Sequence, residues 1–291
     1  MMAGDNVKNK VLEALGIVLL ILFLFPFFIV VINAAKPADQ IIRAPLALPQ
    51  KWGTLFANMN RVIHSPNMNY WKSFFDSVII TVASLFTIVL FSSMAAWVLE
   101  RNSIKHNNKK WANVIFYLLV ASMVIPFQVV MLPVLSWYRT VGKFSGIGLL
   151  QSYKGSVFAY IGFGCAMSVF ILHGFIKSIP LELEEAATID GCTAEGVFGR
   201  VVLPLLQPIQ ITVLILNGIW IWNDYLLPSL LLGQAGKIRT LPIAVMGFVG
   251  SYVKQWDLIL TSTLLAMLPV IVLFIFAQKY IIKGMVEGSI K

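Results

Sequence analysis

Long apolar stretches alternate with short polar ones along this chain. Six of the apolar stretches reach roughly 20 residues, the length at which a helix crosses a hydrocarbon core of about 30 Å. They are Val11–Ile32, Phe74–Val98, Ala112–Leu135, Ser156–Ile176, Ile209–Leu232 and Leu258–Ile282. None shows the alternation over about ten residues that is typical of a membrane barrel strand. The pattern therefore predicts an all-α integral membrane protein with six transmembrane helices.

The polar stretches predict how these spans are connected. We expect three parts: an N-terminal tail of residues 1–10, a membrane domain of residues 11–282 and a C-terminal tail of residues 283–291. Within the membrane domain, we expect residues 33–73 and 233–257 to be external and residues 178–208 to form a cytoplasmic loop. Lys and Arg divide equally between the two faces under this scheme. However, Arg101–Lys110 concentrates four basic residues on the face that holds both tails. Because basic loops stay in the cytoplasm, we expect both termini there.

Composition narrows the functional classes further. The chain is 58% hydrophobic and only 12% charged, which is not the composition of a soluble domain. Its net charge of +9 is scattered over the loops and forms no basic stripe, so nucleic-acid binding is not expected. Its two cysteines provide neither a disulfide framework nor the spacing of a metal site. We expect no catalytic residues and no metal site.

The polar loop 178–208 has its own local organisation. We expect one short helix after Ser178, with Pro180 in its opening turn, that stops at the turn signal Asp190-Gly191. Thr193 can cap a second helix, which we expect to end before Pro204. On these local features alone, a plain connecting loop with two amphipathic turns is an equal alternative.

The spacing within this loop resembles a known motif. Glu185-Ala186-Ala187 is followed after three residues by Gly191, and after nine more by Val201-x-Leu203-Pro204. This is similar to the EAA loop in membrane subunits of ABC importers, and most similar to carbohydrate permeases of the maltose-transporter type. The resemblance implies a type I permease architecture with a cytoplasmic coupling helix. It also implies contacts to an ATPase through Glu184, Glu185, Ala186, Ala187, Asp190, Gly191, Leu203 and Pro204.

The resemblance implies partners as well. A permease of this kind works with a second permease subunit, two copies of an ABC ATPase and an extracytoplasmic sugar-binding protein in the cytoplasmic membrane of a bacterium or archaeon. A heterodimer of permeases is expected, with a homodimer as the alternative. ATP and Mg²⁺ are then bound by the ATPase subunits, and this chain binds no cofactor. The implied function is ATP-driven import of a di- or oligosaccharide.

Some polar side chains interrupt the apolar spans. Carbohydrate sites combine aromatic faces with amides and carboxylates, so these residues are candidates for the substrate pathway. They are Asn217, Asn223 and Gln128, with Asp76, Trp222 and Asp224 near the outer ends. Helix packing around Gln128 and an interfacial aromatic belt at Trp222 remain open alternatives. Related permeases typically have Asn-Ser where Asp76-Ser77 stand.

Two other functional classes fit the sequence less well. A proton- or ion-coupled secondary transporter needs internal repeats and carboxylates at depth, and the spans lack both. A membrane enzyme acting on lipid-linked sugars needs paired acids or a metal site near the membrane surface. The chain also has no phosphate-binding G-x-x-x-x-G-K-[ST] loop of its own.

Overall fold

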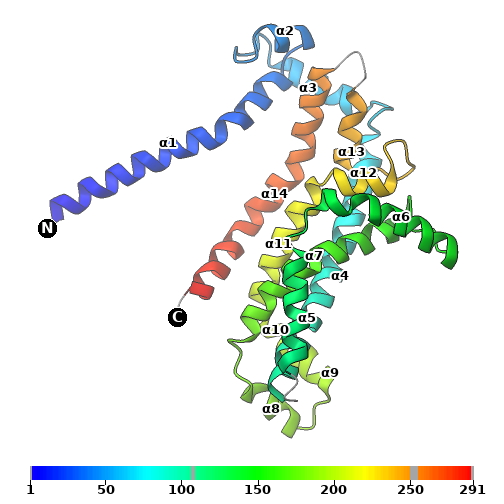
Figure 1. The fold of residues 1–291 in the computed structure, drawn as a ribbon. Coiled ribbons are helices and arrows are strands. Elements are labelled where there is room, and N and C mark those ends of the chain that lie inside the picture. The colour runs from blue at the N-terminus through cyan, green and yellow to red at the C-terminus, as the bar shows by residue number, and fades with distance from the viewer. Residues whose placement is uncertain (1, 106–108, 250–254, 290–291) are drawn as a thin grey trace. The chain divides into compact units, whose positions relative to one another are not determined.

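The computed structural model describes residues 2–105, 109–249 and 255–289. Residue 1 of the predicted N-terminal tail, residues 106–108 of the basic stretch, residues 250–254 of the predicted external loop and residues 290–291 of the predicted C-terminal tail lie outside these ranges. All elements within them are helices (Figure 1): α1 Met2–Ala34, α2 Ala38–Arg43, α3 Gly53–Ile63, α4 Tyr70–Lys105, α5 Lys109–Ser122, α6 Phe127–Ser145, α7 Tyr153–Ile176, α8 Glu182–Ile189, α9 Ala194–Val197, the π-helix η1 Phe198–Val202, α10 Leu203–Leu205, α11 Gln207–Asn223, α12 Leu226–Leu232, α13 Leu241–Val245, the 3₁₀ helix η2 Met246–Phe248 and α14 Trp256–Ser289.

The chain divides into two compact units, which we describe separately. Unit 1 consists of Met1–Trp71 and Ala244–Pro269, and unit 2 of Lys72–Ile243 and Val270–Lys291. In unit 1, α2 and α3 lie beside the C-terminal end of α1 (Figure 1). Most apolar side chains of α1 are exposed, as expected for a helix that is hydrophobic on all sides and lies in a bilayer.

Polar contacts within unit 1 hold α3 to the end of α1 and to α14. The Asn58 amide on α3 donates to the carbonyl oxygen of Ala34, at 3.0 Å, and to that of Lys36, at 3.3 Å. Arg61 on the same helix pairs with Asp257 of α14 at 2.8 Å. The Lys36 ammonium is buried and donates to the Asn33 side chain and the Ala44 carbonyl oxygen, both at 3.0 Å. Burial lowers the pKa of Lys36. The predicted external segment is therefore an ordered cap.

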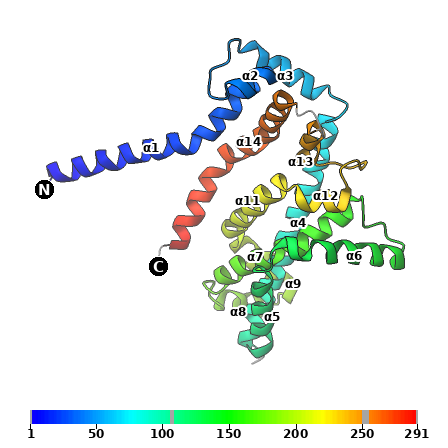
Figure 2. The same ribbon diagram turned by 45° about the horizontal axis from the view of Figure 1, so that its top comes forward.

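Unit 2 is a helical bundle around two apolar clusters. One cluster joins α4, α5, α7 and α11 to the loop helices, and contains Leu99, Leu172, Val197, Val202 and Leu206 among others. The second joins α4, α6, α7, α11 and α12. In two views of the molecule, α8 and α9 lie at one end of this bundle (Figures 1 and 2). The polar loop is thus folded onto the end of the spans.

Four helices in the described part of the chain are long and apolar enough to cross a membrane. They include residues Asn9–Ala34, Tyr70–Arg101, Tyr153–Ile176 and Trp256–Phe276, which match four of the six predicted spans. Two further bent helix pairs bring the number up to six if each pair is one span. The prediction of a multi-span helical membrane protein is confirmed, and the number of spans is four to six.

The predicted span Ala112–Leu135 contains a sharp break. The structure has two helices there, α5 and α6, whose axes differ by 105° across a break of residues 123–126. Pro126 stands at the N-cap of α6 in an extended conformation. A proline has no N–H to continue the helix and disfavours helical geometry in the residue before it. The break therefore follows from Pro126.

The predicted span Ile209–Leu232 is also interrupted. α11 ends at Asn223, Asp224 is extended, and α12 starts at Leu226. The Asp224 carboxylate accepts a hydrogen bond from the Leu226 backbone N–H at 3.0 Å. Aspartate competes in this way with helical backbone bonds, which explains why the helix stops in an apolar sequence. At its other end, α11 follows a 73° bend after α10.

Candidate functional site

The polar loop between α7 and α11 begins with the eight-residue helix α8. Its last turn closes as predicted at Asp190-Gly191. Gly191 has a φ of +86°, and its N–H donates to the Thr188 carbonyl oxygen at 3.0 Å. The Cys192 N–H donates to the Ala187 carbonyl oxygen, also at 3.0 Å. These two bonds form a Schellman motif, which fixes the direction in which the chain leaves the helix.

α8 has two different faces. Glu184 is 1% exposed, and Ala187 packs against the apolar cluster that joins the loop to the bundle. On the other side, Leu183 is 46% exposed and Ile189 is 86% exposed. Glu185 and Ala186 are exposed as well. Of the two predicted contact alanines, only Ala186 therefore lies on the open surface.

The buried Glu184 binds the end of α4. Its Oε1 accepts a hydrogen bond from Arg101 Nε at 2.7 Å, and its Oε2 accepts one from Trp97 Nε1 at 3.0 Å. Arg101 is also buried and donates through Nη2 to the Ile179 carbonyl oxygen at 3.1 Å. Glu184 is one of the predicted ATPase contacts, but its side chain is 1% exposed and turns inward to Arg101 and Trp97.

The second half of the loop is one bent helical segment, α9–η1–α10. Thr193 caps it as predicted, with its hydroxyl oxygen accepting a hydrogen bond from the Gly196 N–H at 3.2 Å. The predicted end before Pro204 is wrong, since the segment continues to Leu205. The Leu203 N–H bonds to the Phe198 carbonyl oxygen, five residues earlier. This wider π-turn accommodates Pro204, which would otherwise clash with the carbonyl group four residues before it. Leu203 is half-buried and Pro204 is exposed.

The outer acids among the substrate-pathway candidates are tied to α7. Asp76 is buried and accepts hydrogen bonds from Tyr153 at 2.6 Å, Lys72 at 2.8 Å and the Arg239 backbone N–H at 3.0 Å. Asp224 accepts one from Tyr160 at 3.1 Å. The two tyrosines are seven residues apart, and thus on one face of α7. Asp76 and Asp224 therefore brace α4 and the end of α11 against the same helix.

The remaining candidates differ in burial. Asn217 is fully buried and donates through Nδ2 to Ser168 of α7 at 3.0 Å, while its Oδ1 has no hydrogen-bond partner among the described residues. Asn223 is exposed on the same helix, and Gln128 is exposed on α6. The Trp222 ring lies 5.9 Å from that of Phe74, measured between centroids. Asn223 and Gln128 are thus exposed, with Asn223 Nδ2 donating to the Ile219 carbonyl oxygen at 2.8 Å, whereas Asn217 makes its contact between two helices.

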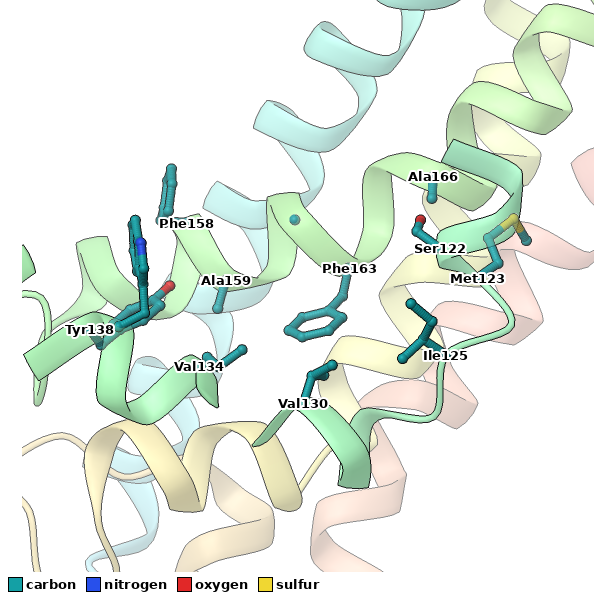
Figure 3. Close-up of a pocket in the computed structure, with 12 residues that line it drawn as sticks. Ser122, Met123, Ile125, Val130, Val134, Tyr138, Phe158, Ala159, Phe163 and Ala166 are labelled. Atoms are coloured by element: carbon teal, nitrogen blue, oxygen red, sulfur yellow. The ribbon is translucent and has the colours of Figure 1, made fainter. Parts of the chain in front are cut away.

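A cavity of about 380 Å³ lies among α5, α6 and α7. Figure 3 shows Phe163 of α7 pointing toward Val130 of α6, with apolar side chains on both sides. The two hydroxyl groups that line the cavity already donate to backbone carbonyl oxygens, Ser122 to that of Leu119 and Tyr138 to that of Gly155. The cavity therefore lacks the converging polar groups that a sugar site needs.

Several residues that make these contacts are not evident as candidates from the sequence. In the sequence, Arg101 is one of several basic residues in the polar stretches, and Trp97 is part of an apolar run. Tyr153 and Tyr160 have no distinguishing feature there. Arg101 lies shortly after the predicted second span, which ends at Val98, and this position is the one signal that it lies at a helix end near other elements. Within the described residues, no group of three or more His, Cys, Asp or Glu side chains can hold a metal ion.

Comparisons with known proteins agree on the class. Residues 69–287 match the family described as binding-protein-dependent transport system inner membrane component. The chain is 37% identical over 286 residues to a probable starch degradation products transport system permease protein of Thermoanaerobacterium thermosulfurigenes, with 98% of each chain covered. It is 31% identical over 296 residues to the melibiose/raffinose/stachyose import permease protein of Bacillus subtilis, with 100% of each covered. This chain also resembles a chain in a crystal structure of a bacterial ABC transporter involved in the import of the acidic polysaccharide alginate, with a TM-score of 0.75 at 20% sequence identity. The match covers 95% of this chain and 97% of that one, which shows the shared fold.

Proposed function

Because the chain belongs to the family of binding-protein-dependent transport system inner membrane components, as a permease subunit of a carbohydrate ABC importer, we propose that it lines the import pathway of a di- or oligosaccharide and couples ATPase motions to that pathway through α8. Subunits of this family are not themselves enzymes. ATP and Mg²⁺ then belong to the partner ATPase. The membership leaves no basis for a secondary transporter or a lipid-linked sugar enzyme.

The exposed face of α8 is the observation that carries the coupling proposal. Leu183 and Ile189 are large apolar side chains in a polar loop, and both are open to solvent. Ala186 lies between them, where its small side chain allows another surface to approach closely, and the exposed Glu185 offers a charge to a basic partner. An apolar patch rimmed by charge is typical of a protein interface. The opposite face is already used inside this chain.

The family implies an ATPase and a substrate-binding protein as partners. We further propose two ATPase copies and a second permease, giving a heterodimer of permeases. One α8 provides one docking helix, and an ATPase dimer that closes symmetrically needs two. In this arrangement, both termini and α8 face the cytoplasm of a bacterial or archaeal cell, and the cap formed by α2 and α3 faces outward.

The substrate class rests on the relatives. Their names refer to starch degradation products, to melibiose, raffinose and stachyose, and to arabinooligosaccharides. In this chain, the exposed amides of Asn223 and Gln128 can offer hydrogen bonds to a sugar, and the half-buried Trp222 can offer an aromatic face. The coupling helix and the sugar contacts therefore lie in different parts of unit 2.

Replacing Ile189 with Asp is expected to separate the chain from its ATPase. Burying an isoleucine side chain in an interface is worth about 1.5–3 kcal/mol, so its loss weakens docking by at least about tenfold. The measurement is co-purification of the ATPase with the tagged permease from detergent-solubilised membranes. Ile147→Asp, at an exposed residue between α6 and α7, is the matched control and retains the ATPase. Equal ATPase recovery with Ile189→Asp would contradict docking through this face.

Two asparagine substitutions on α11 are expected to act differently. Asn223→Leu removes an exposed amide, so the KM for the imported sugar rises by about three- to tenfold while the amount of protein is unchanged. Asn217→Leu removes a buried bond to Ser168, so the amount of folded protein falls. Sugar uptake kinetics and membrane protein level are measured together for both variants. An unchanged KM for Asn223→Leu with every substrate would contradict its place in the pathway.

A further inference from the structure

The cytoplasmic end of α4 is attached to the loop at several points. Arg101 Nε and Trp97 Nε1 each bind one carboxylate oxygen of Glu184, at 2.7 Å and 3.0 Å. Arg101 Nη2 also binds the carbonyl oxygen of Ile179, just before α8, at 3.1 Å. The Trp97 ring lies 5.3 Å from the Phe198 ring in η1, measured between centroids. The segments before, within and after α8 are therefore all attached to α4.

The neighbouring residue on α4 binds α7. Glu100 Oε2 lies 3.0 Å from His173 Nε2, and the Phe116 ring of α5 stacks on His173 at a centroid distance of 4.2 Å. Glu100 and Arg101 thus tie one helix end to two different partners. Neither contact involves the exposed face of α8 formed by Leu183, Glu185 and Ile189.

We propose that Arg101, Glu184 and Trp97 form a clamp that makes α4 move with α8, so that they act as positioning residues for coupling. This inference rests on the proposed function, because it needs an ATPase that moves α8. Arg101 and Glu184 side chains are 7% and 1% exposed, so their bonds are largely shielded from bulk water. Without the clamp, α8 is joined to the bundle by the chain segments on either side of it and by apolar contacts, which allow sliding.

Stability alone does not explain a buried ion pair here. Two well-packed apolar side chains at the same positions are often as stable as a buried charge pair. What they lack is direction, because apolar contacts do not fix the angle between two helices as two charge-assisted bonds to one carboxylate do. A cavity of about 270 Å³ borders Arg101 and Glu184, so methionine side chains fit there without overpacking.

The test replaces both charges in the complete complex with ATPase and binding protein. Arg101→Met or Glu184→Met alone leaves one buried charge unpaired, so we expect less assembled complex. Arg101→Met with Glu184→Met restores assembly to within about twofold of the wild type, while sugar imported per ATP hydrolysed stays at least about tenfold lower. Gln210→Met is the control, since Gln210 lies on α11 and binds Ser93 of α4 at 3.0 Å, and it keeps the wild-type ratio.

A second variant covers failure of the double variant to assemble. Trp97→Phe keeps an aromatic ring and removes only the bond to Glu184 Oε2, so we expect normal assembly with about threefold less sugar per ATP. A wild-type ratio in an assembled double variant, or in Trp97→Phe, would overturn the clamp and leave the proposed function standing. A wild-type chain that imports sugar without any ATPase would overturn both.

Discussion

Import by a Glu185→Lys variant is expected to fall by at least about tenfold, while the protein remains inserted in the membrane. Glu185 is exposed on α8 beside Ala186, and its carboxylate belongs to the face that we assign to the ATPase. A charge-assisted contact there is worth about 1.5–3 kcal/mol, and a lysine adds repulsion from the basic partner group. Stimulation of the ATPase by the loaded binding protein should be lost together with import.

Two control variants make this expectation specific. Glu195→Lys changes the net charge by the same amount at an exposed residue of the same loop, on α9 instead of the exposed face of α8, and import should remain within about twofold of the wild type. Glu185→Gln keeps the shape of the side chain and part of its hydrogen bonding, so an intermediate rate is expected. Equal loss in both lysine variants would show that the loop responds to charge in general and would refute a defined contact at Glu185.

A Gly191→Val variant is expected to lose import to a similar extent. Gly191 closes α8 with a φ of +86°. A Cβ atom disfavours this region by about 1–2 kcal/mol, and a β-branched side chain disfavours it more. The space around Gly191 is open, because a Cβ atom added there would meet nothing within 4 Å beyond its chain neighbours, so the cost is conformational and not steric. The helix should then leave at another angle.

The matched control at this turn is Gly191→Asn. Asparagine adopts the left-handed conformation more readily than other residues with a side chain, so it should retain most of the import activity. Import assays and membrane protein levels are compared for the three forms. If the valine variant imports sugar at the wild-type rate, the angle fixed by Gly191 has no part in coupling.

The boundaries of α8 follow from local chemistry, which explains why the sequence predicts them. Asp190-Gly191 ends the helix because glycine accepts a positive φ, and Thr193 starts the next because its hydroxyl oxygen caps a free N–H. Both effects act over a few residues of chain. Neither requires knowledge of what lies opposite the helix.

The faces of α8 depend instead on distant residues. Glu184 and Glu185 are adjacent acids, and nothing local distinguishes the buried one from the exposed one. The choice is made by Arg101 and Trp97, which lie more than 80 residues earlier in the chain. The motif alone therefore groups Glu184 with the ATPase contacts, whereas the structure gives it an internal partner.

The breaks in the predicted spans have a similar explanation. Apolar length predicts that a stretch can cross a membrane, but it does not reveal where the backbone leaves helical geometry. Asp224 interrupts its stretch because its carboxylate has partners in Leu226 and, on another helix, Tyr160. Pro204 stays within a helix because a π-turn makes room for it. In both cases tertiary structure or a rare turn overrides the local signal.

In the mechanism that we propose, this chain moves sugar only when an ATPase drives α8. The most direct measurement is uptake of labelled oligosaccharides by proteoliposomes that contain the permease complex purified with its co-expressed partners, with the binding protein outside and ATP either present or absent inside. We expect uptake that requires both ATP and the binding protein and is lost with Glu185→Lys. Uptake by the purified chain alone, at the same rate without ATP or any ATPase, would contradict the account.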